Sequence, residues 1–435
     1  MNRKSILARV ILLLVAITIA SCSPQASPQT PTPAQIDRPT PPPNFVTVSD
    51  GRFMLEGRPY YFVGTNFWQG MNLGVDGPKG DRALLVAELD RLQRIGVTNL
   101  RVMASSEGPN TEPYRMVPAL MTSPGVYDES VLEGLDFFIA EMGKRDMKAV
   151  MVLNNYWQWS GGMGQYVSWS EGTSIPYPGD WGEFMNYVAQ FYDCTECQTW
   201  YRDHIEMIIN HSNPYTGLKY RDDPTVFAWE LANEPRRYPY SWIDETAAYI
   251  KSLDPNHLVT TGSEGTPPGE SRDFQRTHDG PNIDYATVHI WPQNWGWYDP
   301  ANPTTYERAE QNALEYLRRH VFDMAVVDKP LVLEEFGLAR DWEPVQDIYN
   351  PESSTMYRDR FYKAMFTEVY ELSLKGGSVV GDNFWAWGGA SHPGDDWLGD
   401  PPHETPGWYS VYDTDISTLE IITEHARNMT QVRNP

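Results

Sequence analysis

The sequence predicts a (β/α)8 TIM barrel, an α/β fold in which eight parallel strands alternate with helices. Two observations predict it. Eight short apolar stretches that resemble buried strands recur between residues 44 and 435, and amphipathic stretches with helical spacing separate most of them. No second linker interrupts this region, so we expect one large domain rather than two.

The predicted barrel strands follow one another at regular intervals. They are residues 61–66, 97–102, 148–154, 226–233, 258–262, 285–289, 331–335 and 379–385. Helical patterns at 82–95, 131–142 and 357–374 each run up to a glycine, which is a common helix stop. Ahead of the first strand, residues 45–61 predict a short N-terminal β-hairpin that caps one end of the barrel, because they contain the turn pairs Asp50-Gly51 and Glu56-Gly57.

Residues 1–22 have the pattern of an export signal. A basic start precedes an apolar run, residues 10–20, that is too short to span a membrane comfortably. The run ends in Ile19-Ala20-Ser21-Cys22, which resembles the lipobox of bacterial lipoproteins and predicts lipidation at Cys22. We therefore expect an exported protein, lipid-anchored to the outer membrane or cell surface. The alternative is an ordinary secretory signal with an incidental cysteine.

Residues 23–43 are rich in proline and threonine and predict an extended tether, which leaves residues 44–435 as the catalytic domain. The remaining cysteines, Cys194 and Cys197, are three positions apart. A structural zinc site would need a second pair. In an exported protein a local disulfide is favoured over a redox-catalytic pair.

The composition excludes one class of partner and favours another. The 435 residues contain 58 acidic and 34 basic side chains, and a formal net charge of −24 argues against nucleic acid. The 16 Trp and 25 Tyr residues exceed the usual need of a core. Aromatic faces stack on the apolar faces of sugar rings, so a neutral polysaccharide is a suitable substrate for a protein that we expect to be a monomer.

Two of the predicted strands end in a carboxylate beside a breaker residue. Residues 229–235 read Trp-Glu-Leu-Ala-Asn-Glu-Pro, and residues 330–337 read Pro-Leu-Val-Leu-Glu-Glu-Phe-Gly. Burying a charge is costly, and a pair of carboxylates at the same end of a barrel fits glycoside hydrolysis, in which one donates a proton and the other attacks the sugar or activates water. The alternative is that each Glu caps a loop or pairs with a surface Arg.

Further polar residues fall at other predicted strand ends. Arg101 can lower the pKa of a neighbouring nucleophilic carboxylate. Asn233 precedes the acid of its strand and is placed to bond a sugar 2-hydroxyl, and His289 and Trp385 end two later strands. We expect these side chains to meet at the C-terminal face of the barrel.

These motifs resemble glycoside hydrolase family 5, and within it the endo-β-1,4-mannanase branch. The matching stretches are residues 64–68 (Gly-Thr-Asn-Phe-Trp), 213–217 (Asn-Pro-Tyr-Thr-Gly), 222–236, 289–295 and 333–337. The resemblance implies that Glu234 is the general acid/base and Glu335 the nucleophile of a retaining double displacement on β-mannan, glucomannan or galactomannan. It implies supporting roles for Arg101, Asn233, His289 and Trp385, and substrate-binding roles for Trp68, Asn155 and Trp157.

The resemblance has one departure, at Trp291. Many relatives have Tyr two residues after the His, where its hydroxyl points toward the nucleophile, so Trp291 is expected to bind substrate without replacing that hydrogen bond. Glu335 is preferred over Glu334 because adjacent strand residues face opposite sides. The mechanism requires a raised pKa for Glu234. No metal-ligand motif is present and no cofactor is implied.

Two other functions fit the same residues. One is an endo-β-1,4-glucanase on the same barrel, since the sequence does not define how an axial 2-hydroxyl is recognised. The other is a non-catalytic glycan-binding lipoprotein, which the presence of both Glu234 and Glu335 disfavours.

Overall fold

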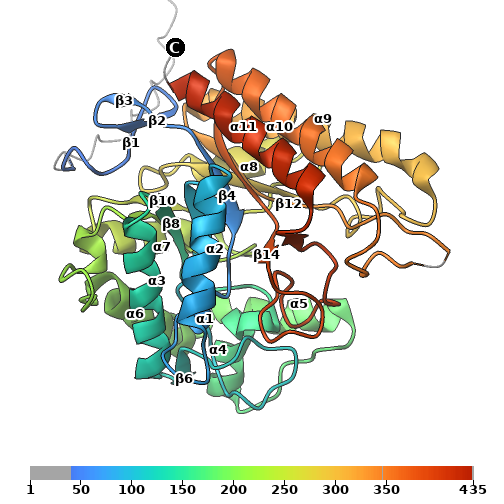
Figure 1. The fold of residues 1–435 in the computed structure, drawn as a ribbon. Coiled ribbons are helices and arrows are strands. Elements are labelled where there is room, and N and C mark those ends of the chain that lie inside the picture. Colours follow the sequence, from blue (N-terminus) through green and yellow to red (C-terminus); the bar gives the residue numbers. More distant parts are fainter. Residues whose placement is uncertain (1–40, 345, 434–435) are drawn as a thin grey trace, which may run out of the picture. The chain divides into compact units, whose positions relative to one another are not determined.

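Eight parallel strands form the centre of the fold. The computed structural model describes residues 41–344 and 346–433, and its ribbon is drawn in Figure 1. The strand order is β10-β9-β8-β5-β4-β13-β12-β11, and a parallel bridge between Thr260 and Tyr285 joins the two ends of the sheet. The predicted (β/α)8 TIM barrel is therefore confirmed. The strands are β4 (Phe62–Asn66), β5 (Asn99–Met103), β8 (Lys148–Val152), β9 (Val226–Glu230), β10 (Leu258–Thr260), β11 (Ala286–Ile290), β12 (Leu331–Phe336) and β13 (Val379–Phe384).

A helix follows each barrel strand and covers the outside of the sheet. Nearly every residue of the eight strands is buried, because the helices cover one face and the barrel interior occupies the other. Asp81 and Asp128 cap two of the helices by accepting backbone N–H bonds in the first turn. The helices are α2 (Arg82–Arg94), α3 (Glu129–Gly143), α6 (Thr195–Asn210), α7 (Tyr240–Leu253), α8 (Ser271–His278), α9 (Tyr306–Val327), α10 (Met356–Leu374) and α11 (Ile416–Arg433).

The segment before the barrel is a three-stranded antiparallel sheet and not the single hairpin that the sequence predicts. Its strands are β1 (Thr47–Ser49), β2 (Arg52–Leu55) and β3 (Arg58–Pro59). Both turn pairs, Asp50-Gly51 and Glu56-Gly57, have positive φ throughout, so each makes its own tight turn and the two hairpins share β2. Phe53 of β2 packs its buried ring 5.0 Å from that of Phe227 and 5.3 Å from that of Tyr285, and caps the N-terminal end of the barrel.

Shorter elements lie in the connections between barrel strands and helices. Between β8 and α6 the chain forms η1 (Gln158–Ser160), α4 (Gly162–Glu171), α5 (Trp181–Ala189) and η2 (Gln190–Tyr192). After β13, β14 (Trp387–Gly389) and β15 (Val411–Tyr412) enclose the irregular segment 390–410. The others are α1 (Gly70–Leu73), β6 (Met121–Ser123), β7 (Val126–Tyr127), η3 (Tyr220–Asp222) and η4 (Pro303–Thr305).

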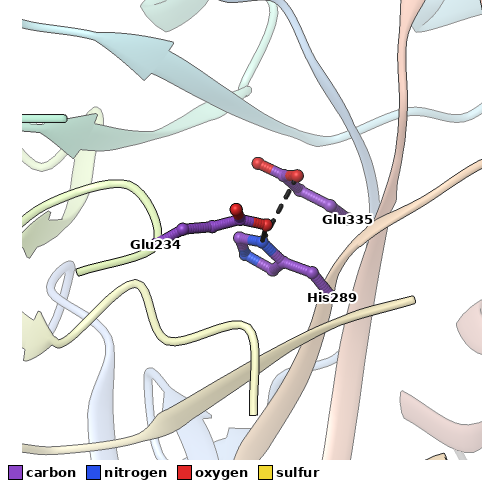
Figure 2. A group of neighbouring side chains, drawn as sticks. All are labelled: Glu234, His289 and Glu335. Atoms are coloured by element: carbon purple, nitrogen blue, oxygen red, sulfur yellow. Dashed lines mark hydrogen bonds and ion pairs between the residues drawn. The ribbon is translucent and has the colours of Figure 1, made fainter. Parts of the chain in front are cut away.

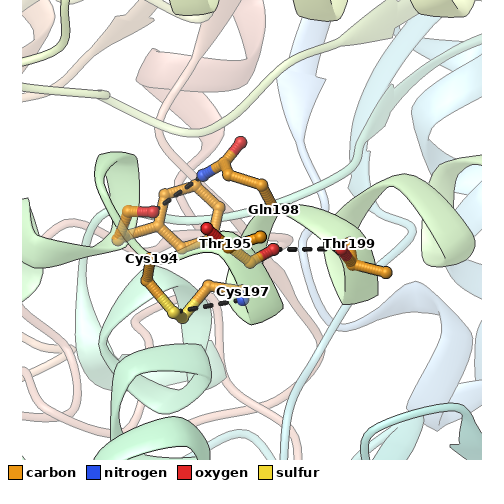
Figure 3. The surroundings of a disulfide bond; sticks show 6 residues. Cys194, Thr195, Cys197, Gln198 and Thr199 are labelled. Carbon is orange, nitrogen blue, oxygen red and sulfur yellow. Dashed lines mark hydrogen bonds between the residues drawn. A yellow bond between two sulfur atoms is a disulfide. The ribbon is translucent and has the colours of Figure 1, made fainter.

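A disulfide joins Cys194 and Cys197 at the start of α6, where the sequence places a candidate pair (Figure 3). The Cys194 sulfur also accepts the backbone N–H of Cys197, 3.1 Å away, in the position of a helix cap. Gln198 donates to the carbonyl of Phe191 at 2.7 Å and ties the helix start to the preceding turn.

The signal, the Cys22 lipobox and most of the tether lie outside the described residues, so they stay predictions. The residues that the structure describes belong to one compact unit. Among the residues that the structure describes, no helix combines the length and apolar character needed to cross a membrane.

Candidate active site

Glu234, His289 and Glu335 come together at the C-terminal ends of the barrel strands (Figure 2). His289 lies on β11 and Glu335 on β12, whereas Glu234 stands four residues beyond the last residue of β9. His289 Nδ1 is 2.8 Å from Glu234 Oε1 and 3.3 Å from Glu335 Oε2. One ligand-type atom from each residue falls within 4.8 Å of the other two, so the two carboxyl groups face each other closely.

Backbone hydrogen bonds hold the segment that carries Glu234. Leu231 donates to the carbonyl of Thr260 and Glu234 to that of Gly262, both at 2.9 Å, while Asn233 donates to Asn154 on the opposite side. Glu234 has φ +46°, a left-handed conformation that costs a non-glycine residue energy and that surrounding contacts must impose. Gly262 has φ +74°, and a Cβ there would lie 2.0 Å from the carbonyl oxygen of Ala232. The close approach of Gly262 to this segment therefore helps to hold Glu234 in place.

Glu334 and Glu335 both face the inside of the barrel, contrary to the strand-alternation argument. Val288 pairs with Leu333 and His289 with Glu335, so Glu334 is an extra residue in a β-bulge. The Glu334 carboxylate lies 3.4 Å from His289 Nε2 and 3.5 Å from the Nε of Arg101. Only Glu335 of the two lines the open cleft, so the preference for Glu335 stands on exposure to the cleft and not on alternation.

Arg101 of β5 is the buried cation at the base of the site. Its guanidinium donates to both oxygens of Glu230, at 2.8 and 2.5 Å, and to Asn233 Oδ1 at 2.8 Å. It also donates to Asn66 Oδ1 and makes a short ion pair with Glu335 Oε1. One fully charged group therefore connects strands β4, β5, β9 and β12 and fixes the nucleophile candidate.

The pKa values in this cluster differ from the sequence expectation for Glu234. Burial raises the pKa of Glu234, but the hydrogen bond and charge of His289, the charge of Arg236 and the hydrogen bond from Trp157 outweigh burial and lower it to about 2. The prediction of a raised pKa is therefore wrong for the free protein. His289 holds the proton instead: burial lowers its pKa, yet the charge of Glu335 and hydrogen bonds to carboxylates raise it to about 10.

Burial also overrides the effect that the sequence assigns to Arg101. The charges of His289 and Arg101 lower the pKa of Glu335, as expected, but burial and the neighbouring carboxylates of Glu234 and Glu334 leave it raised. Glu230 behaves alike, and its pKa rises to about 8 mainly because it is buried. The cluster holds more carboxylates than cations, so its protons are shared among the members.

The same three side chains are of the kind that could coordinate a divalent ion. Their positions are explained without one, because His289 bonds to both carboxylates and Arg101 to Glu335. The arrangement is suited to proton transfer and nucleophilic attack by side chains alone.

A cleft of about 520 Å³ opens over Glu234 and Glu335. Of the other predicted site residues, Asn233, Trp157, Trp291 and Trp385 line it. Further cleft residues that the sequence interpretation did not single out are Trp159, Tyr177, Trp181, Met185, Arg236, Glu264, Asn294, Trp295, Pro401, His403, Glu404 and Trp408.

Four predicted site residues stand behind the cleft wall and act on it indirectly. Arg101 and His289 are buried under the two carboxylates. Asn155 is fully buried and accepts a 3.0 Å hydrogen bond from Asn233 Nδ2, so it positions Asn233 and does not itself reach substrate. Trp68 donates to the carbonyl of Gly399 at 2.7 Å and packs against Trp159, which is the residue that lines the cleft.

Trp291 lines the cleft and supplies no hydroxyl to Glu335. Its ring packs 5.7 Å from that of Trp385 and 4.9 Å from that of Tyr409, and the Tyr409 hydroxyl donates to Asn294 instead of to the nucleophile candidate. The recorded partners of the Glu335 carboxylate are Arg101 and His289. Two buried side chains, Arg101 and His289, therefore hold Glu335, and Trp291 does not.

Some of the missed residues had a signal and others had none. Glu264 follows the predicted fifth strand, and the same strand-end reasoning applies to it. It pairs with Arg236, whose guanidinium lies 2.6 Å from Glu264 and 3.8 Å from Glu234. Burial and the charge of Glu234 raise the pKa of Glu264 to about 7. His403, Glu404 and Trp408 come from the irregular segment 390–410, which carries no periodic pattern.

Comparison with known proteins agrees with this geometry. A crystal structure of a glycoside hydrolase family 5 mannosidase from Rhizomucor miehei is 43% identical, with a TM-score of 0.86 over 90% of this chain and 99% of that one. An endo-β-1,4-mannanase from Thermotoga petrophila is 26% identical, with a TM-score of 0.67 over 86% and 78% of the two chains. A mannan endo-1,4-β-mannosidase of Oryza sativa is 33% identical over 410 residues, covering 88% of this chain and 86% of the relative. The model of the glycoside hydrolase family 5 β-mannosidase-like family matches residues 43–434, and the chain belongs to that family of glycoside hydrolases.

Proposed function

We propose that this protein is a retaining endo-β-1,4-mannanase that cleaves mannan, glucomannan or galactomannan. The observation that carries the proposal is the pair Glu234 and Glu335, with carboxyl oxygens within 4.8 Å across an aromatic-lined cleft. Retaining glycosidases place their two carboxyl groups about 5–5.5 Å apart, whereas inverting enzymes leave about 6.5–9.5 Å for a water molecule. The short separation supports direct attack by a carboxylate.

In the proposed reaction Glu335 attacks the anomeric carbon while Glu234 protonates the departing glycosidic oxygen. The resulting glycosyl–Glu335 ester is then hydrolysed by water, from which Glu234 takes a proton. Arg101 supports the first step because it holds one oxygen of Glu335 and keeps charge on it.

His289 supplies the proton that Glu234 lacks in the free protein. Its Nδ1 is 2.8 Å from Glu234 Oε1, and transfer across this hydrogen bond leaves a neutral imidazole whose Nε2–H points at Glu334, 3.4 Å away. Trp157 donates to the other Glu234 oxygen at 2.7 Å and orients the carboxyl group. A substrate that excludes water from the cleft favours this neutral arrangement, since it removes the charges on both groups.

The sugar specificity is proposed from the relatives. The plant relatives are named as mannan endo-1,4-β-mannosidases, and a mutant of the Rhizomucor miehei mannosidase was solved with mannosyl-fructose. The cleft offers Trp159, Trp291 and Trp385 as apolar surfaces and Asn233 as a hydrogen-bonding group. These groups suit a neutral pyranose chain.

The decisive experiment is hydrolysis of galactomannan, glucomannan and carboxymethylcellulose by the wild type, Glu335→Gln and the matched variant Glu334→Gln. We expect activity on the mannans, its loss in Glu335→Gln, and a β-configured first product by proton NMR. An endo enzyme lowers viscosity much faster than it releases reducing ends. Activity on carboxymethylcellulose alone would make the protein a glucanase, and release of mannose alone would make it an exo-acting mannosidase.

We also propose that the protein is exported as a monomer and anchored through lipid at Cys22. The sequence Ile19-Ala20-Ser21-Cys22 supports acylation, and one chain supplies both carboxylates and the cleft lining. The test is labelling with a fatty-acid probe in a bacterial host, with Cys22→Ser as the control. Label retained in Cys22→Ser would refute lipidation at this cysteine, and light scattering of the soluble domain measures its oligomeric state.

A further inference from the structure

A group of exposed and half-buried aromatic side chains continues the catalytic cleft outward along one side. Trp181, the first residue of α5, lines the cleft and is 56% exposed, and Tyr114 is 45% exposed. Tyr177 connects them, with its ring 6.0 Å from that of Trp181 and 5.8 Å from that of Tyr114. We call Tyr114, Tyr177 and Trp181 the outer aromatic platform.

The platform is held firmly from behind. Buried Phe184 packs 5.8 Å from the ring of Trp181 and 5.9 Å from that of Tyr177. Phe184 also stacks on Trp157 at 5.9 Å, and the Trp181 ring meets Trp157 edge-on at 5.7 Å. The Asp180 carboxylate accepts the backbone N–H of Glu183 and caps α5 at the residue before Trp181. An exposed indole in such fixed surroundings is suited to stacking because little side-chain freedom is lost on binding.

The topology places the platform on the leaving-group side of the scissile bond. Glu234 follows β9, and Trp157 and the platform residues Tyr177 and Trp181 follow its neighbour β8. Trp157 bonds directly to the Glu234 carboxyl that must reach the glycosidic oxygen. Glu335 lies on β12, and the rings beside its strand, Trp291 and Trp385, follow β11 and β13. The two ends of the cleft are therefore lined by different aromatic groups.

We propose that the outer aromatic platform binds the C–H faces of sugar units on the leaving-group side of a β-1,4-linked hexopyranose chain, beyond the unit that contacts Glu234. This inference rests on the proposed function and extends it. The occupant is a polysaccharide because the platform is continuous with the catalytic cleft and because exposed rings pack on pyranose faces without requiring charge. The platform favours long chains as substrates.

The test compares Trp181→Ala with Trp342→Ala, which removes an indole of similar exposure, 43%, that does not line the cleft. KM is measured for mannohexaose and for 4-nitrophenyl β-mannobioside, whose sugars all lie on the attacked side of the bond. Loss of one aromatic contact predicts that the KM ratio of mannohexaose to aryl substrate rises about three- to tenfold in Trp181→Ala. Trp181→Phe retains part of the contact, and Trp342→Ala keeps the wild-type ratio.

Two results would overturn the proposal. An unchanged KM ratio in Trp181→Ala would refute sugar binding by the platform. An equal rise in KM for both substrates would show that Trp181 serves the attacked side of the bond or the fold. Failure of the wild type on mannans would refute the proposed function separately. In that case the same ratio is measured with the β-1,4-glycan that the wild type does cleave, and the comparison of Trp181→Ala with Trp342→Ala still decides whether the platform binds sugar.

Discussion

Replacing Arg101 with Met removes the cation that compensates the buried carboxylates. Breaking a buried ion pair by removing one partner costs about 3–5 kcal/mol, because the remaining charge stays in a poorly solvating site. Here Glu230 and Glu335, the two carboxylates that hydrogen-bond to Arg101, take most of the loss, while Glu334 stands farther away at 3.5 Å. Glu230 already has a pKa of about 8 with Arg101 present. Since one pKa unit equals about 1.36 kcal/mol, a loss of this size divided between two carboxyls raises each pKa by about one to two units.

The kinetic consequence follows from the proposed role of Glu335 as the nucleophile. The nucleophile must be ionised, so activity falls as pH drops through its pKa, and a higher pKa moves the acid limb of kcat/KM upward. We expect the limb to move by about one to two pH units in Arg101→Met, with a lower free energy of unfolding in urea.

A double variant separates stability from chemistry. Arg101→Met with Glu230→Leu replaces the ion pair by apolar groups and should recover much of the stability, because such replacements are often neutral. Glu335 still lacks its cation there, so the acid limb stays displaced. An acid limb at the wild-type pH in either variant would refute the reasoning, whatever the stability.

Four further predictions concern neighbouring residues. Glu234→Ala lowers kcat on galactomannan by about 10²- to 10⁴-fold and costs much less on 4-nitrophenyl β-mannosides, whose leaving group needs little protonation; equal losses would exclude the acid role. His289→Asn removes the group whose pKa of about 10 holds the proton, so the alkaline limb of kcat/KM moves to lower pH, and an unmoved limb would contradict the proton assignment. Gly262→Ala brings a Cβ against Ala232 at φ +74° and lowers the free energy of unfolding by more than about 1 kcal/mol. The control is Gly217→Ala, at φ +73° with open space around it, and its free energy of unfolding falls by less. Replacing Cys194 and Cys197 by Ser costs at most about 2 kcal/mol in urea unfolding, because the four-residue loop restricts few unfolded conformations.

The barrel is predictable from the sequence because its signals are local. Each strand is a short apolar run, each helix has its own periodicity, and the stop signals at Gly96, Gly143 and Gly376 adjoin the predicted helices. Local chemistry also marks Glu234 and Glu335, because a charge at the end of an apolar strand is rarely placed for stability. The resemblance to family 5 glycosidases then assigns their roles.

The arrangement around the two carboxylates depends on contacts between residues far apart in the chain. The β-bulge that turns Glu334 inward is a register shift between β11 and β12, and period-two alternation does not reveal it. The low pKa of Glu234 depends on His289, 55 positions later, and burial reverses the expected effect of Arg101 on Glu335. Electrostatic effects sum over all neighbours, so no pair of residues predicts them.

The barrel, the two carboxylates and the order of the strand ends that carry them can be predicted from the amino-acid sequence, because hydrophobic periodicity and costly buried charges are local properties. Three features of the cleft follow from folding alone: which aromatic rings line it, the place of Asn155 and Trp68 behind its wall, and the arrival of His403 and Glu404 from segment 390–410. Side-chain exposure and proton affinity depend on what folds against a residue, so no local pattern in the sequence predicts them.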